Sequence, residues 1–184
     1  MYSLILILGV ALWSGAHLFK RIAPERRAAL GDGFRGPVSL MLLASLVLMV
    51  IGYRGMDGAF FWGRHPATVG INNLLMLVSV YLFAASGMKT AMGQKMRHPM
   101  LIGVKTWALA HLLVNGDVAS FILFGGLLAW AVVEVILINK QTTWVKPATV
   151  TVNARKEVMA LVGTLVVYGV AVGIHYWLGY PTFG

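Results

Sequence analysis

The stretch Pro99–Ile138, PMLIGVKTWALAHLLVNGDVASFILFGGLLAWAVVEVILI, decides the fold of this chain. It runs for 40 residues, and its only interruption is the turn Asn115-Gly116-Asp117. A helix needs about 20 apolar residues to cross the roughly 30 Å of hydrocarbon in a bilayer. Backbone groups in lipid must also be hydrogen-bonded internally, which favours helices. The stretch therefore predicts two membrane-spanning helices joined by a tight turn.

Four further apolar runs flank this stretch. They are Tyr2–Phe19, Pro37–Tyr53, Ile71–Met88 and Val158–Tyr180. Together they predict an all-α, polytopic membrane helix bundle with six transmembrane helices, forming a single transmembrane domain over residues 1–184. The composition agrees, because 59% of the residues are hydrophobic and only 11% are charged. A soluble domain has about 25% charged residues, so the composition disfavours soluble enzymes, disordered tails and disulfide-stapled secreted domains.

The basic residues set the orientation of the predicted spans. Twelve of the fifteen fall in the loops after the first, third and fifth spans: Lys20, Arg21, Arg26, Arg27, Arg35, Lys89, Lys95, Arg97, Lys140, Lys146, Arg155 and Lys156. The positive-inside rule puts these loops in the cytoplasm and both termini on the extracytoplasmic side. The first span has no positive segment before it and is interpreted as an uncleaved anchor. The net charge of +9 then indicates attraction to an anionic lipid bilayer, and nucleic acid is not an expected partner.

Few ionisable residues lie inside the predicted spans, and such residues usually serve a function. They are His17, Lys105, His111, Glu134 and His175, while His65 and His98 lie in or beside loops. The chain has no Cys, which excludes disulfides, cysteine zinc sites, iron–sulfur clusters and thiolate-bound haem. Imidazole groups in an apolar helix bundle suit haem b, which needs only one or two axial nitrogens. Trp13 and Trp107 each precede a histidine by four residues, so an indole ring shares the helix face of His17 and of His111.

Several motifs resemble the NnrU family of bacterial membrane proteins. They are Arg97-His98-Pro99-Met100-Leu101-Ile102-Gly103, Trp107-Ala108, His111-Leu112, Asn115-Gly116-Asp117, Trp13 with His17, and the late His175. The resemblance covers nearly the whole chain. It implies a multi-pass protein of the bacterial cytoplasmic (inner) membrane with a redox- or nitric-oxide-linked role associated with denitrification. The family is also similar to plant zeta-carotene isomerases, haem b enzymes that act on an apolar substrate through paired histidines. That likeness assigns the iron ligands to His17 and His111, with His98, His175 and Trp107 as further cofactor-binding candidates.

The depth of each histidine can be counted along the six predicted membrane-spanning helices. These depths favour histidine pairs other than His17 with His111. His111 follows His98 by 13 residues, which is roughly 20 Å of helix. Depth in the membrane then favours His17 with His98, or His111 with His175. Helix tilt or a sunken Asn115-Gly116-Asp117 turn would reconcile this depth with the His17–His111 pair.

Two other classes of function remain open. Arg97-His98-Pro99 followed by Glu134 resembles the S-adenosylmethionine site of membrane methyltransferases, although Leu101 stands where an aromatic residue is usual and a second acid is missing. The other class is a non-catalytic accessory or assembly protein, in which Glu134 pairs with Lys105 inside the bundle. Counting from the turn leaves these two residues roughly 10 Å apart in depth. A direct ion pair is therefore doubtful, and Lys105 is expected to extend towards the cytoplasm.

Overall fold

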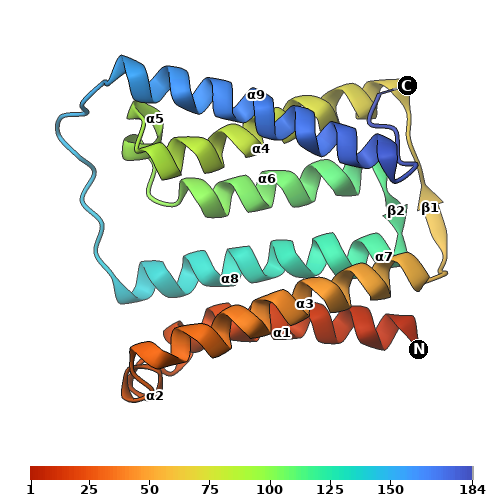
Figure 1. Ribbon diagram of the computed structural model, residues 1–184, viewed down its shortest axis with the longest axis horizontal. Coiled ribbons are helices and arrows are strands. Elements are labelled where there is room, and N and C mark those ends of the chain that lie inside the picture. Colours follow the sequence, from red (N-terminus) through yellow and green to blue (C-terminus); the bar gives the residue numbers. More distant parts are fainter. Residues whose placement is uncertain (184) are drawn as a thin grey trace. The chain divides into compact units, whose positions relative to one another are not determined.

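The computed structural model describes residues 1–183, which form two compact units. The first unit combines Met1–Trp62 with Gly116–Gln141, and the second combines Gly63–Asn115 with the described part of Thr142–Gly184. In the first unit the elements are α1 (Tyr2–Ile22), α2 (Pro24–Ala29), η1 (Asp32–Phe34), α3 (Arg35–Gly55), β1 (Phe60–Trp62), β2 (Gly116–Asp117), α7 (Val118–Ser120), η2 (Phe121–Gly125) and α8 (Gly126–Gln141). In the second they are α4 (Pro66–Met88), α5 (Ala91–Lys95), α6 (Pro99–Val114) and α9 (Ala154–Trp177). Figure 1 labels the α-helices and the two strands among these elements.

Within residues 1–183, five helical segments are long and apolar enough to cross a membrane. They are Tyr2–Ile22, Asp32–Gly55, Pro66–Met88, Val118–Gln141 and Ala154–Trp177. These segments confirm a predominantly helical protein with several candidate membrane-spanning helices. The remaining predicted span, α6, is apolar but has only 16 residues, or about 24 Å of helix.

Glycine residues bring α1 and α3 into close contact in the first unit. A Cβ atom added to Gly52 would lie 2.5 Å from the backbone nitrogen of Leu6, and one added to Gly9 would lie 2.8 Å from the Met49 side chain. A Cβ atom added to Gly126, at the start of α8, would lie 2.7 Å from the Val10 side chain of α1. The absence of side chains lets the helix backbones approach closely, as in many membrane helix pairs.

The predicted Asn115-Gly116-Asp117 turn becomes part of a small antiparallel strand pair. Gly116 in β2 pairs with Trp62 in β1, and the indole ring occupies the space where a Cβ of residue 116 would lie. Asp117 then caps α7, since its carboxylate accepts hydrogen bonds from the backbone N–H of Ser120 at 2.8 Å and from the Ser120 hydroxyl at 3.0 Å. This capping starts the helical segment that continues through the π-helix η2 into α8.

The second unit is built around α4, which packs against both α6 and α9. The Ser79 hydroxyl on α4 donates a buried hydrogen bond of 2.8 Å to the carbonyl of Gly103 on α6. At one end of this unit the Arg97 guanidinium donates to the carbonyl of Thr142 at 2.6 Å, and the Glu157 carboxylate on α9 accepts from the N–H of Ala91 at 2.7 Å. These contacts hold the starts of α6 and α9 at the same end of the unit.

Candidate functional site

Two of the predicted histidines meet in the second unit. His111 lies one turn before the end of α6, and His175 lies at the corresponding place in α9. Each is within one turn of the end of its helix, and their side chains lie close together there. Their ring centroids are 6.4 Å apart, with 43° between the ring planes. His111 with His175 is one of the two pairs that were favoured by the depths of the histidines in the predicted membrane spans.

Three histidines inside apolar helices share one local arrangement. In each case the Nδ1 atom lies close to the backbone carbonyl oxygen of the residue four positions earlier. The distance is 3.0 Å from His17 to Trp13, 2.9 Å from His111 to Trp107 and 2.7 Å from His175 to Ala171. Each carbonyl belongs to the residue four positions earlier and can only accept. The proton of a neutral ring is therefore on Nδ1, and the lone pair is on Nε2. Histidines that bind metal ions through Nε2 commonly have their other nitrogen fixed in this way.

Trp107 completes the cluster in the second unit. Its ring centroid lies 5.1 Å from that of His111, so the predicted sharing of one helix face is confirmed. His98 is at the other end of α6, where it occupies the N-cap position before Pro99. The length of α6 therefore separates His98 from the His111–His175 pair.

His17 belongs to the first unit, where it lies between two indole rings. Its ring centroid is 4.4 Å from that of Trp13 and 4.7 Å from that of Trp130 on α8. The two indoles pack edge to face, with centroids 5.6 Å apart. His17 and His111, the pair implied by the family resemblance, are thus in different units, as are His17 and His98. The assignment of iron to His17 and His111 stays a prediction.

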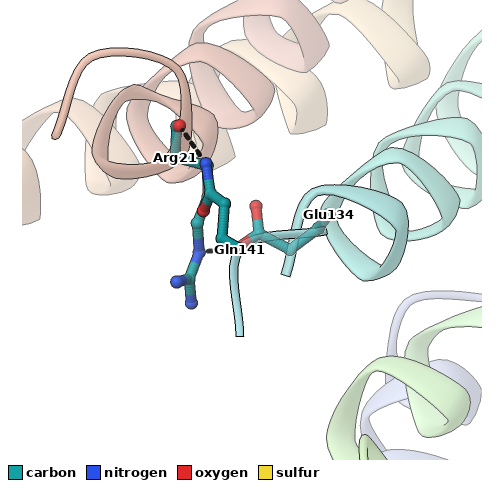
Figure 2. A network of polar contacts seen from close by, with 3 residues as sticks. All are labelled: Arg21, Glu134 and Gln141. Atoms are coloured by element: carbon teal, nitrogen blue, oxygen red, sulfur yellow. Dashed lines mark hydrogen bonds and ion pairs between the residues drawn. The ribbon is translucent and has the colours of Figure 1, made fainter. Parts of the chain in front are cut away.

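Glu134 forms an ion pair next to this aromatic cluster. Its Oε1 atom accepts a hydrogen bond of 3.1 Å from Nε of Arg21. Figure 2 shows the two side chains facing each other from α1 and α8, with Gln141 beside them. The Gln141 side chain donates a hydrogen bond of 2.6 Å to the backbone carbonyl of Arg21. The carboxylate that was considered as a partner for Lys105 is therefore bound by Arg21.

Sequence reasoning missed Arg21 and Trp130 as members of this cluster. Trp13, His17 and Arg21 recur at intervals of four residues, and Trp130 precedes Glu134 by four. The spacing puts each set on one helix face, so the signal was present in the sequence. Arg21 had been counted only as a charge that sets the orientation.

The histidines do not form a closed metal site of the zinc type. Across residues 1–183 there is no group of three or more His, Asp or Glu side chains arranged to hold a metal ion. The His111–His175 pair supplies two nitrogens, which suffice for haem iron but fall short of a structural zinc site.

These features describe a predominantly helical protein with several helices long and apolar enough to span a membrane, and with histidines inside those apolar helices. The family model described as NnrU protein matches residues 5–182, and the chain belongs to the NnrU family. No curated protein and no solved structure matches the chain.

Proposed function

We propose that this protein binds haem b in its second unit, where His111 and His175 would hold the iron. The distance between the two imidazole rings is the observation that supports this assignment. With metal–nitrogen bonds of about 2.0 Å, two imidazole rings can hold one ion when their centres lie within roughly 6 to 7 Å of each other. The observed centroid distance is 6.4 Å.

The surroundings of the two rings suit the same ligand. Both Nδ1 atoms donate to backbone carbonyls, so the lone pairs lie on Nε2, as a metal ligand requires. α6 and α9 are apolar, and Trp107 adds an aromatic surface beside His111. Haem is an apolar group whose iron carries one electron or binds a diatomic gas, and the protein sets its properties through the axial ligands.

We further propose a redox- or nitric-oxide-linked role in the inner membrane of a denitrifying bacterium. The family resemblance supports this role, and the two-histidine haem site supplies the chemistry for it. In this proposal α6 is a sixth span and both termini are extracytoplasmic. Contacts within the second unit support a membrane-spanning α6. α6 and α9 start at the same end of the unit, and the last turn of α6 lies at the opposite end, beside His175.

Absorption spectra of single-histidine variants test the proposal. The purified wild-type protein is expected to show a haem Soret band that shifts on reduction with dithionite and again on addition of nitric oxide. His111→Ala and His175→Ala are expected to lose the haem or the two-histidine spectrum. His17→Ala, His98→Ala and the control His65→Ala, an exposed helix cap, should keep both. Loss in His17→Ala with retention in His175→Ala would favour the pair implied by the resemblance and overturn this assignment.

A further inference from the structure

We propose that the first unit carries a second, separate binding site, formed by α1 and α8, for the ring of a membrane-soluble quinol. Trp13, His17, Trp130 and Glu134 form this site, which is called the quinol cluster below. All four residues belong to the same compact unit. The rings of Trp13, His17 and Trp130 contact one another, and Glu134, four residues after Trp130 on α8, forms the ion pair with Arg21.

Unsatisfied polar atoms gather in the quinol cluster. In residues 1–183, the indole Nε1 atoms of Trp13 and Trp130 and the Oε2 atom of Glu134 are buried without a hydrogen-bond partner. Trp130 is 7% exposed and Glu134 is 8% exposed. Leaving a buried polar group unpaired costs about 1–3 kcal/mol, and more for a charged one. Three such atoms in neighbouring side chains indicate a missing ligand with polar groups of its own.

The donors and acceptors define the chemistry of that ligand. The two indole N–H groups only donate, and the Oε2 atom of Glu134 and the Nε2 lone pair of His17 only accept. A hydroxyl group both donates and accepts. A ligand with two hydroxyl groups can therefore satisfy all four atoms, and the two hydroxyls of a quinol provide this combination on one flat ring.

The charge of the cluster favours a neutral ligand. Arg21 and Glu134 already neutralise each other through their 3.1 Å ion pair. A phosphate, or any other net charge added beside them, would be desolvated without a counter-ion. The two indole rings beside His17 carry no charge, which suits a neutral, aromatic ligand.

The depth of the cluster favours a lipophilic molecule. His17 is five residues before Ile22, the end of α1, and Glu134 is seven residues before Gln141, the end of α8. At 1.5 Å per residue these distances are about 8 and about 10 Å below the helix ends. A quinol ring with an apolar tail reaches this depth from the bilayer, whereas a lipid headgroup lies nearer the surface.

Titration with decylubiquinol, a short-tailed quinol, tests the proposal. Binding is measured calorimetrically with the full-length protein in maltoside micelles. Trp130→Phe keeps the aromatic ring but removes the N–H group, so affinity is expected to fall about five- to tenfold, as for the loss of one hydrogen bond. Glu134→Gln, which turns part of the acceptor into a donor, should cause a similar or larger loss. Trp177→Phe, at a position that is 84% exposed, is the matched control and should bind as the wild type does.

The haem spectrum separates this proposal from the haem site. Quinol binding that is lost in Trp130→Phe while the Soret band remains supports two separate sites. Unchanged quinol affinity in both Trp130→Phe and Glu134→Gln would overturn the proposal. Loss of haem in these variants would also overturn it, because the cluster would then serve the haem. Displacement of the quinol by phosphatidylethanolamine would overturn it as well, because the cluster would then bind a lipid headgroup. If the protein holds no haem at all, the titration still tests the quinol cluster by itself.

Discussion

A histidine side chain can lie inside an apolar helix when one of its ring nitrogens bonds to the helix backbone. His17, His111 and His175 all use the carbonyl four residues earlier. The bond satisfies one nitrogen locally and directs the lone pair of the other away from its own helix turn. What a histidine then does depends on the side chains next to its ring. These are a second imidazole for His111, and the indoles of Trp13 and Trp130 for His17.

The Arg21–Glu134 ion pair should make a measurable contribution to stability. Arg21→Met leaves the largely buried Glu134 carboxylate without its counter-ion and is expected to lower the free energy of unfolding by about 2 kcal/mol. The value is below that of a fully buried pair because a quarter of the Arg21 side chain is exposed. The double variant Arg21→Met with Glu134→Leu should recover most of the loss. Unfolding in sodium dodecyl sulfate, followed by circular dichroism, measures both effects.

The exposed Asp32–Arg35 pair provides the control for this double-variant experiment. Its atoms are 2.8 Å apart, closer than those of Arg21 and Glu134, but the side chains are 88% and 76% exposed. Water and salt screen such a pair, so Asp32→Asn should leave the unfolding curve unchanged. A loss at Asp32 as large as that at Arg21 would show that burial does not decide the strength of these pairs.

At the scale of elements, glycine positions decide how α1 and α3 pack. Gly52→Ala would bring a Cβ to 2.5 Å from the Leu6 nitrogen, a backbone atom that cannot rotate away. The two helices must then separate, and the free energy of unfolding is expected to fall by about 2–3 kcal/mol. Thermal unfolding of the purified protein measures the loss.

Gly15→Ala is the matched control for this packing. Gly15 lies in the same helix pair, but a Cβ added to it would meet nothing within 4 Å. Alanine should therefore be neutral there, or stabilising by up to about 1 kcal/mol through its higher helix propensity. Equal destabilisation by both substitutions would mean that helix propensity, and not the close contact, governs the stability of the pair.

At the scale of the whole molecule, the sequence predicted what depends on local pattern. Apolar runs located the long helices to within a few residues, and spacing by four residues placed Trp13 beside His17 and Trp107 beside His111. Counting helix rise favoured the His111–His175 pair, which the structure brings together. The Arg21–Glu134 pair was not predicted because its members are 113 residues apart. Only the packing of α1 against α8 brings them into contact.

The orientation of the protein in the membrane can be measured by single-cysteine labelling. The chain contains no cysteine, so a maleimide can react only with the one that is introduced. With six spans and extracytoplasmic termini, Asp57→Cys, in the loop after α3, should react with a membrane-impermeant maleimide in intact cells. Val145→Cys, at an 82% exposed position between α8 and α9, should react only after permeabilisation. Met92→Cys in α5 should behave as Val145→Cys does, since the side chain of its neighbour Gln94 bonds to the Thr151 carbonyl of the same loop. Labelling of Val145→Cys but not Met92→Cys in intact cells would mean that the 16-residue α6 fails to cross, and that the chain has five spans.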